Sequence, residues 1–174
     1  MNPKSIKLKA SVAVLLIFMQ AGCGYHLSGT GGSLRKYMRT ISIPVFENES
    51  NEPLIQRQFT DAVRQAFLTD GRLRLAGPKK ADLLLIGIID VYGVRSVAFS
   101  KDDVVTESII TLGVTVNVKD QVKKKAYMKN ELKADRDFRS DSLVINSEAA
   151  RQAALEEAYR DLARQIVSLV INRF

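Results

Sequence analysis

Apolar residues recur at helical spacing in two segments of the chain. In residues 54–70 they lie three or four positions apart, as on one face of an α-helix, and Gly71 follows where a C-terminal cap belongs. Residues 146–173 keep the same spacing over a longer stretch, and Asn146 or Ser147 can cap its start. The sequence therefore predicts two amphipathic helices, whose apolar positions are Ile55, Phe59, Ala62, Val63, Ala66 and Phe67 in the first and Leu155, Tyr159, Leu162, Ile166 and Leu169 in the second.

Alternation with a period of two residues predicts the strands. Residues 110–119 and 126–138 alternate apolar and polar side chains, which predicts a long antiparallel hairpin with one buried face. Residues 83–91 are apolar on both alternating faces, as in a central strand covered on each side, and this strand can continue to Phe99. Shorter strands are predicted at 40–46, where Pro44 favours an edge position, and at 72–76.

The order of these elements predicts the fold class. It indicates an α+β two-layer domain over residues 40–174, with two α-helices packed on one face of a four- to five-stranded mixed sheet. Residues 166–171, at the end of the second helix, are apolar on nearly all sides. Such a segment must be covered, either by deeper burial in the core of this domain or by a partner protein.

The first 22 residues have the pattern of a secretory signal. A lysine-containing start precedes an apolar run at 10–19, which is shorter than the roughly 20 residues of a bilayer span. Small residues then lead to Cys23, the only cysteine. The segment resembles a bacterial lipoprotein signal, in which this cysteine is acylated and becomes the mature N-terminus. Gln20 stands where such signals usually have leucine, and the alternative is an ordinary signal peptide with an incidental cysteine.

Acylation of Cys23 would determine the location of the protein. Two or more acyl chains hold a protein stably on a membrane, and lipoproteins of this kind carry three. By the same resemblance, Gly24 implies passage to the outer membrane, with the body of the protein on the periplasmic side. Residues 23–39, with four glycines, are predicted to be a lipidated flexible tether.

Charge and composition narrow the classes of function. The formal net charge is +7, and because three lysines belong to the signal, the mature chain carries +4. This surplus permits an anionic partner without requiring one, and a periplasmic location excludes nucleic acid. With a single cysteine, no disulfide can form within the chain.

The sequence offers no group of residues suited to catalysis or to a metal or cofactor. His26 is the only histidine and lies in the predicted tether, and no Gly-Lys-Ser/Thr phosphate loop is present. Asp102 and Asp103 indicate a solvated turn. Asp90, in the predicted central strand, is the one carboxylate placed for burial, and a satisfied structural role is favoured over a functional one. We therefore expect a binding or assembly protein rather than an enzyme, with no cofactor and no metal.

Several short segments together resemble the LptE family of lipopolysaccharide-assembly lipoproteins. They are residues 23–27 (CGYHL), residues 44–48 (PVFEN), the strand at 111–119 and the long C-terminal helix. The resemblance implies two helices on one face of a mixed sheet. It also implies a subunit that plugs the outer-membrane barrel LptD, helps it to assemble and binds lipopolysaccharide. A pilotin or an accessory lipoprotein of another outer-membrane machine is the alternative.

The turn of the long hairpin departs from the family pattern and is strongly basic. The family often has a Gly-Lys pair and an aromatic residue there, whereas residues 119–126 of this chain read KDQVKKKA. Lys119, Lys123, Lys124 and Lys125 are candidate ligands of the phosphates of lipopolysaccharide, because ammonium groups bind phosphates as point charges. The alternative is a solubilising turn that protects the edge of the sheet.

Overall fold

The computed structural model describes residues 34–102, 104–139 and 144–172, so the predicted signal and Cys23 lie outside the described residues. The elements are β1 (Thr40–Ser42), β2 (Glu47–Asn48), α2 (Ile55–Asp70), β3 (Arg74–Leu75), β4 (Leu83–Phe99), β5 (Val105–Asp120), β6 (Lys125–Arg139) and α3 (Val144–Ile171). Both predicted helices and the long hairpin are therefore present.

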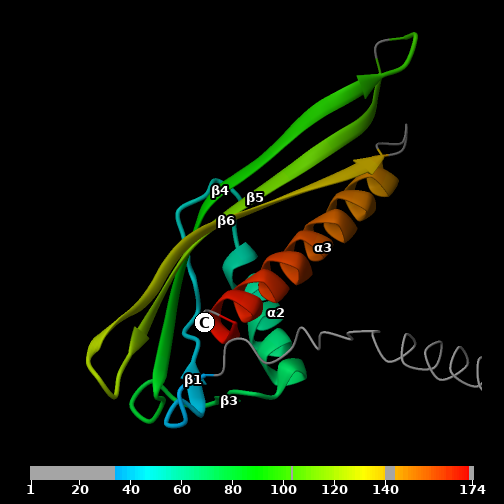
Figure 1. Ribbon diagram of the computed structural model, residues 1–174. Helices are drawn as coiled ribbons and strands as arrows, with labels where there is room; N and C mark the ends of the chain where they lie inside the picture. The colour runs from blue at the N-terminus through cyan, green and yellow to red at the C-terminus, as the bar shows by residue number, and fades with distance from the viewer. Residues whose placement is uncertain (1–33, 103, 140–143, 173–174) are drawn as a thin grey trace, which may run out of the picture. The chain divides into compact units, whose positions relative to one another are not determined.

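The strands form one mixed sheet that packs against both helices (Figure 1). Its order is β3-β1-β4-β5-β6, and β2 pairs separately with β4. The short strands β1, β2 and β3 pair in parallel, while β4, β5 and β6 are antiparallel. This arrangement confirms the predicted α+β class, and its six strands exceed the expected four or five because the segment at 40–46 contributes a strand and is followed by a second one, β2.

The first strand differs from the prediction in its length and its place in the sheet. β1 ends at Ser42, two residues before Pro44, which has no N–H group to donate to a neighbouring strand. β1 lies between β3 and β4 instead of at an edge. The edge inference from Pro44 was wrong because the proline lies outside the paired part of the strand.

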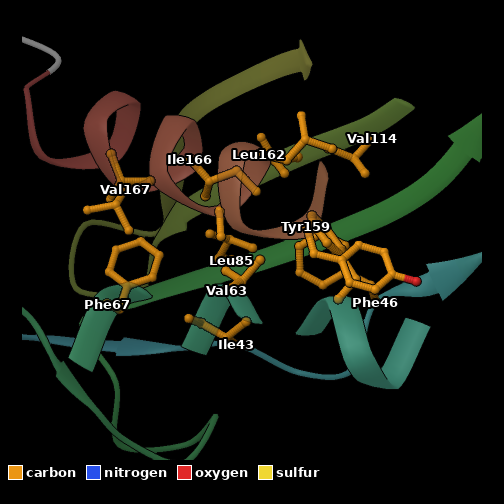
Figure 2. Packing of buried hydrophobic residues seen from close by; sticks show 14 of the residues in the cluster. Ile43, Phe46, Val63, Phe67, Leu85, Val114, Tyr159, Leu162, Ile166 and Val167 are labelled. Carbon is orange, nitrogen blue, oxygen red and sulfur yellow. The ribbon is translucent and has the colours of Figure 1, made fainter. Parts of the chain in front are cut away.

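The core lies between the helices and one face of the sheet (Figure 2). Phe46 meets Phe59 of α2 edge to face with ring centroids 4.9 Å apart, and Phe59 in turn lies 5.8 Å from Tyr159 of α3. Gly87 makes room for this aromatic group, since an added Cβ would lie 2.0 Å from a ring carbon of Phe46. The buried face of β5 includes Val114 and Val116, as the alternation predicted.

The end of α2 agrees with its sequence signal, whereas the predicted cap of α3 at Asn146 or Ser147 was wrong, because that helix begins at Val144. Gly71 adopts a left-handed conformation with φ of 74°, and its N–H donates to the carbonyl of Phe67 at 3.1 Å. At the end of α3, the apolar residues Ile166, Val167, Val170 and Ile171 are all buried within this chain. Of the two explanations for that apolar tail, burial in the domain's own core is the one observed.

The second face of β4 is not covered as predicted. Leu83, Leu85 and Ile89 are fully buried beneath the helices, but Leu84, Ile86 and Ile88 point to the opposite face and are only half-buried. Both described helices pack on the same face, because tight turns join β4, β5 and β6 and no crossover helix is needed on the other side. We call this opposite side the outer face of the sheet.

Candidate functional site: a basic hollow beside the turn between β5 and β6

The basic residues predicted to bind phosphate lie at one end of the long hairpin. A four-residue turn, residues 121–124, connects β5 to β6, and Asp120 and Lys125 pair on either side of it. Lys124 has φ of 52°, a left-handed conformation that is uncommon for a residue with a side chain. The lysine side chains of this turn therefore extend from a backbone that adopts a specific turn conformation.

A hollow of about 520 Å³ opens beside this turn. Register explains its composition, because Leu84, Lys119 and Ala126 form one row across β4, β5 and β6 on the outer face. The hollow combines lysines with apolar and amide groups, and its lining consists of Leu84, Asn117, Lys119, Asp120, Gln121, Lys124, Lys125 and Ala126. It has a volume typical of ligand sites, although it is open on one side.

The four candidate lysines do not all meet at this hollow. Lys119, Lys124 and Lys125 line it, and all three are exposed. The ammonium of Lys123 lies instead 5.2 Å from the ring centroid of Tyr37, within the range of a cation–π contact. The structure thus separates three lysines around one cavity from a fourth that packs on an aromatic ring.

Asp120 is the buried group at the base of the turn, with only 1% of its surface exposed. Its carboxylate accepts a hydrogen bond from the Tyr37 hydroxyl at 2.6 Å and another from the backbone N–H of Lys123 at 2.9 Å. Burial acts to raise the pKa of Asp120, but these donors outweigh it and the pKa lies below its ordinary value. The carboxylate is therefore ionised at neutral pH and holds the turn in place.

Gln121 provides a second attachment for the turn. Its side-chain amide donates to the carbonyls of Ala81 at 2.8 Å and Pro78 at 3.0 Å, and its backbone N–H donates to the carbonyl of Asp82 at 2.8 Å. The turn is thus bound to the loop that precedes β4. Its backbone is fixed at both Asp120 and Gln121, so the three lysine side chains extend from a rigid base.

Sequence analysis missed Tyr37, Asp120 and Gln121 as parts of this site. Tyr37 was assigned to the flexible tether, yet it bonds to Asp120, and the adjacent Met38 is 3% exposed. One signal for Asp120 was available, because it occupies the next inward-facing position after Val114, Val116 and Val118. A carboxylate in that apolar series indicates a buried acid that needs partners.

Asp90 does not have the burial expected of it. It is exposed on the outer face, where it accepts a hydrogen bond from the Thr115 hydroxyl at 2.6 Å. Register irregularity between Ile89 and Val91 interrupts the pairing of β4 at this residue. The Asp90 carboxylate therefore has a hydrogen-bond partner, but the expectation that it is buried was wrong.

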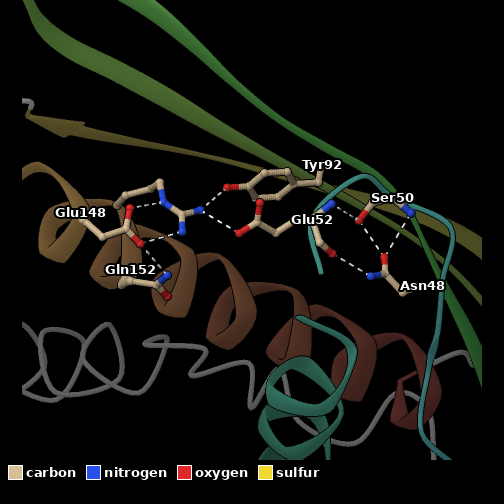
Figure 3. Close-up of polar contacts among 7 residues, drawn as sticks. Asn48, Ser50, Glu52, Tyr92, Glu148 and Gln152 are labelled. Carbon is tan, nitrogen blue, oxygen red and sulfur yellow. Dashed lines mark hydrogen bonds and ion pairs between the residues drawn. The ribbon is translucent and has the colours of Figure 1, made fainter. Parts of the chain in front are cut away.

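A second polar cluster, which includes Glu52, Tyr92 and Glu148, lies near the start of α3 (Figure 3). Arg151 joins its members. Its guanidinium donates to both carboxylate oxygens of Glu148, to Glu52 at 3.1 Å and to the hydroxyl of Tyr92. The hydrogen bonds from Arg151 and Gln152 lower the pKa of Glu148 to about 2. This cluster joins α3 to β4 and to the loop before α2, which gives it a clear structural role.

The described parts of the chain hold no candidate metal cluster and no helix suited to crossing a membrane. Within them, no group of three or more histidine, cysteine or acidic residues is placed to hold a metal ion. Neither α2 nor α3 combines the length and the apolar character needed to cross a bilayer.

Comparison with known proteins identifies the family. The family model described as "LptE: Lipopolysaccharide-assembly" matches residues 38–170, which include every described strand, all of α2 and all but the last residue of α3. The chain belongs to the LptE family. This LptE-family chain is accordingly a lipopolysaccharide-assembly lipoprotein of the outer membrane, and the family is a non-enzymatic one.

Solved structures agree in fold at low sequence identity. Rare lipoprotein B from Shewanella oneidensis is 16% identical, with a TM-score of 0.54 over 72% of this chain and 92% of that chain. A minor lipoprotein from Acinetobacter baumannii is 19% identical, with a TM-score of 0.51 over 76% and 90%. An uncharacterized lipoprotein B from Nitrosomonas europaea is 16% identical, with a TM-score of 0.54 over 81% and 90%. No curated protein matches the sequence.

Proposed function

We propose that this LptE-family protein is anchored by an acylated Cys23 on the periplasmic side of the outer membrane. It assembles with an LptD-type barrel, plugs the barrel, and binds lipopolysaccharide on its way to the cell surface. The phosphates of the ligand bind at the basic hollow, through Lys119, Lys124 and Lys125.

The observation that carries the ligand site is the gathering of three exposed lysines around one hollow. Asp120 is the one carboxylate in its lining, and its oxygens are engaged by Tyr37 and by the backbone of the turn. The hollow consequently presents a surplus of positive charge to a ligand. Phosphates are the groups of lipopolysaccharide that such a surplus attracts.

Lys123 has a supporting place in this proposal. Its ammonium lies over the ring of Tyr37, and its backbone N–H donates to the carboxylate of Asp120. Lys123 therefore contributes to the shape of the turn and to the local positive potential. Changing Lys123 would disturb this anchorage. The decisive variant therefore leaves Lys123 unchanged and removes only the lysines that line the hollow.

The test is the triple variant Lys119→Ser, Lys124→Ser, Lys125→Ser. Each lysine near an anionic surface contributes about 1 kcal/mol, so binding of purified lipopolysaccharide should weaken at least tenfold. The residual binding should also depend less on salt, because fewer charges are screened. Measuring the affinity for lipopolysaccharide at low and at high salt tests both expectations. As a control on assembly, the barrel should still copurify with the triple variant after mild detergent extraction.

A matched control removes the same number of charges elsewhere. Arg57, Arg95 and Lys101 are exposed and none of them lines the hollow or belongs to the loop that holds the turn, so their joint change to Ser should leave affinity within about twofold of wild type. Equal losses in the two triple variants would mean that only net charge matters. Unchanged affinity in the first variant would leave the turn as a solubilising, edge-protecting device.

A further inference from the structure

A strip of aliphatic side chains leads away from the basic hollow along the outer face of β4. Leu84, Ile86 and Ile88 occupy alternate positions and are half-buried. Leu84 itself lines the hollow, so the strip and the lysines share one surface. Ile88 lies four positions after Leu84 along the strand, which corresponds to about 13 Å.

The neighbours of the strip give it a direction. At the Leu84 end, Lys119 stands beside it on β5. At the Ile88 end, Glu47 pairs with Ile88, Asp90 lies two residues further along β4, and Glu131 lies beyond Thr115; all three are acidic and exposed. Of the lysines that flank Glu131 on β6, Lys129 stands nearer the middle of the strip, beyond Asn117, and Lys133 pairs with Asp135. An anionic group is therefore favoured at the first end and disfavoured at the second, while the aliphatic side chains between them offer no hydrogen bonds.

We propose that this strip holds an acyl chain of the phosphorylated lipid whose phosphate binds in the basic hollow. The inference rests on the proposed function, since it requires the lysines to bind the head of the same molecule. The chain runs from Leu84 towards Ile88, away from the ammonium groups. Its length is suitable, because 13 Å is close to the roughly 15 Å that the hydrocarbon of one bilayer leaflet occupies.

A phosphorylated lipid and a free phosphate should differ in how they bind to the lysines and the aliphatic strip. A free phosphate uses the lysines and leaves Leu84, Ile86 and Ile88 in contact with water. A lipid with both groups also removes aliphatic surface from water, on the protein and on the ligand. Affinity for the acylated molecule should therefore exceed affinity for its water-soluble head group, and the difference should depend on the strip.

The test uses the double variant Ile86→Thr, Ile88→Thr in the full-length protein. Threonine retains β-branching and suits a strand position that is only half-buried. Binding of purified lipid A should weaken at least fivefold, whereas binding of its deacylated, bisphosphorylated disaccharide should match wild type. The control Val94→Thr, Val97→Thr changes exposed apolar residues of β4 beyond the strip and should leave both affinities unchanged.

The outcomes separate this inference from the proposed function. If the double variant binds lipid A as wild type does while the triple lysine variant loses affinity, the acyl-chain inference is overturned and the lysine site stands. If the lysine variant also binds normally, the lysine site itself fails. If the double variant retains lipid affinity but loses the copurifying barrel, the strip contacts the barrel and the inference is again overturned.

A second measurement does not depend on the stability of the double variant. A photo-crosslinking residue introduced as Ile88→p-benzoylphenylalanine should label lipid A on illumination. The same residue introduced as Val94→p-benzoylphenylalanine should label it several times less, because position 94 lies beyond the strip and pairs with the buried Ile110, on the helix side of the sheet. Equal labelling at the two positions would contradict a chain bound along Leu84, Ile86 and Ile88.

Discussion

Asp120 determines the geometry of the basic turn at the scale of single residues. It is a carboxylate in an otherwise apolar inward series, and Tyr37 and the backbone of the turn satisfy its oxygens. A buried charge is tolerated only with such partners. The consequence is that an acidic residue, itself almost inaccessible, positions the neighbouring lysines that face solvent.

The pKa of Asp120 predicts how this turn responds to acid. Because the folded pKa lies below the ordinary value of about 3.9, folding favours the ionised form. The resulting stabilisation is present above the unfolded pKa and is lost as pH falls through the folded pKa. We expect Asp120→Asn to lower the free energy of unfolding at pH 7 by about 1–3 kcal/mol, through loss of charge-assisted hydrogen bonds.

Urea unfolding at pH 7, 5 and 3 measures this effect. The difference in unfolding free energy between wild type and Asp120→Asn should be largest at pH 7 and 5 and should shrink at pH 3. Asp90→Asn, which alters an exposed carboxylate, should change stability at pH 7 far less. A constant difference across the three pH values would show that the ionisation of Asp120 does not stabilise the fold.

At the scale of elements, β5 is the strand whose two faces are most clearly distinct. Val114 and Val116 are at most 1% exposed beneath the helices, whereas Thr115 and Asn117 lie on the outer face. Because side chains alternate strictly along a strand, a shift of one residue would exchange the two sets. The stability of single variants therefore reports the register directly.

We predict that Val116→Asp unfolds the domain or nearly does so. It places an unpaired charge in the core at a cost of several kcal/mol, which is comparable with the total stability of an ordinary domain. Asn117→Asp is the matched control, because it adds the same charge on the outer face opposite Lys129. Thr115→Asp should also be milder than Val116→Asp, although it faces Asp90 and like charges there cost a few tenths to 1 kcal/mol.

Thermal unfolding followed by circular dichroism distinguishes these variants. The transition of Val116→Asp should be lost or shifted down by more than 10 °C, while that of Asn117→Asp should move by no more than a few degrees. Equal shifts for the two variants would contradict the register of β5 against the helices.

At the scale of the whole molecule, the proposed attachment to the membrane depends on Cys23, which lies outside the described residues. Neither described helix can serve as a membrane span. In the proposal, acyl chains on one thiol supply the anchorage, and each buried methylene contributes about 0.8 kcal/mol. Anchorage and folding are then separable properties of the chain.

We expect Cys23→Ser to abolish acylation and either leave the signal uncleaved or release the protein from the outer membrane. Metabolic labelling with a radioactive fatty acid, followed by membrane fractionation, measures both. Substitution of Ser28, which lies in the predicted tether, should change neither. A wild-type protein that incorporates no label would refute the lipoprotein assignment of Cys23.

Much of the fold was predictable because local periodicity reflects which side faces a core. The helix at 55–70 and its Gly71 cap, the long C-terminal helix and the β5–β6 hairpin all follow from spacing in the sequence. The place of β1 between β3 and β4 did not follow, since strand order depends on contacts between distant segments. Pro44 indicated only that pairing stops nearby.

The chemistry of the candidate site was predictable in kind but not in arrangement. Sequence alone determined that the hairpin turn is basic, that the inward face of β5 is apolar, and that the chain resembles the LptE family. Only the tertiary structure decided that Lys119, Lys124 and Lys125 share a hollow while Lys123 packs on Tyr37. The physical reason is that sequence periodicity indicates only which side of its own helix or strand a residue occupies. The position of Leu84, Lys119 and Ala126 side by side depends on the register of three strands, which the tertiary structure sets.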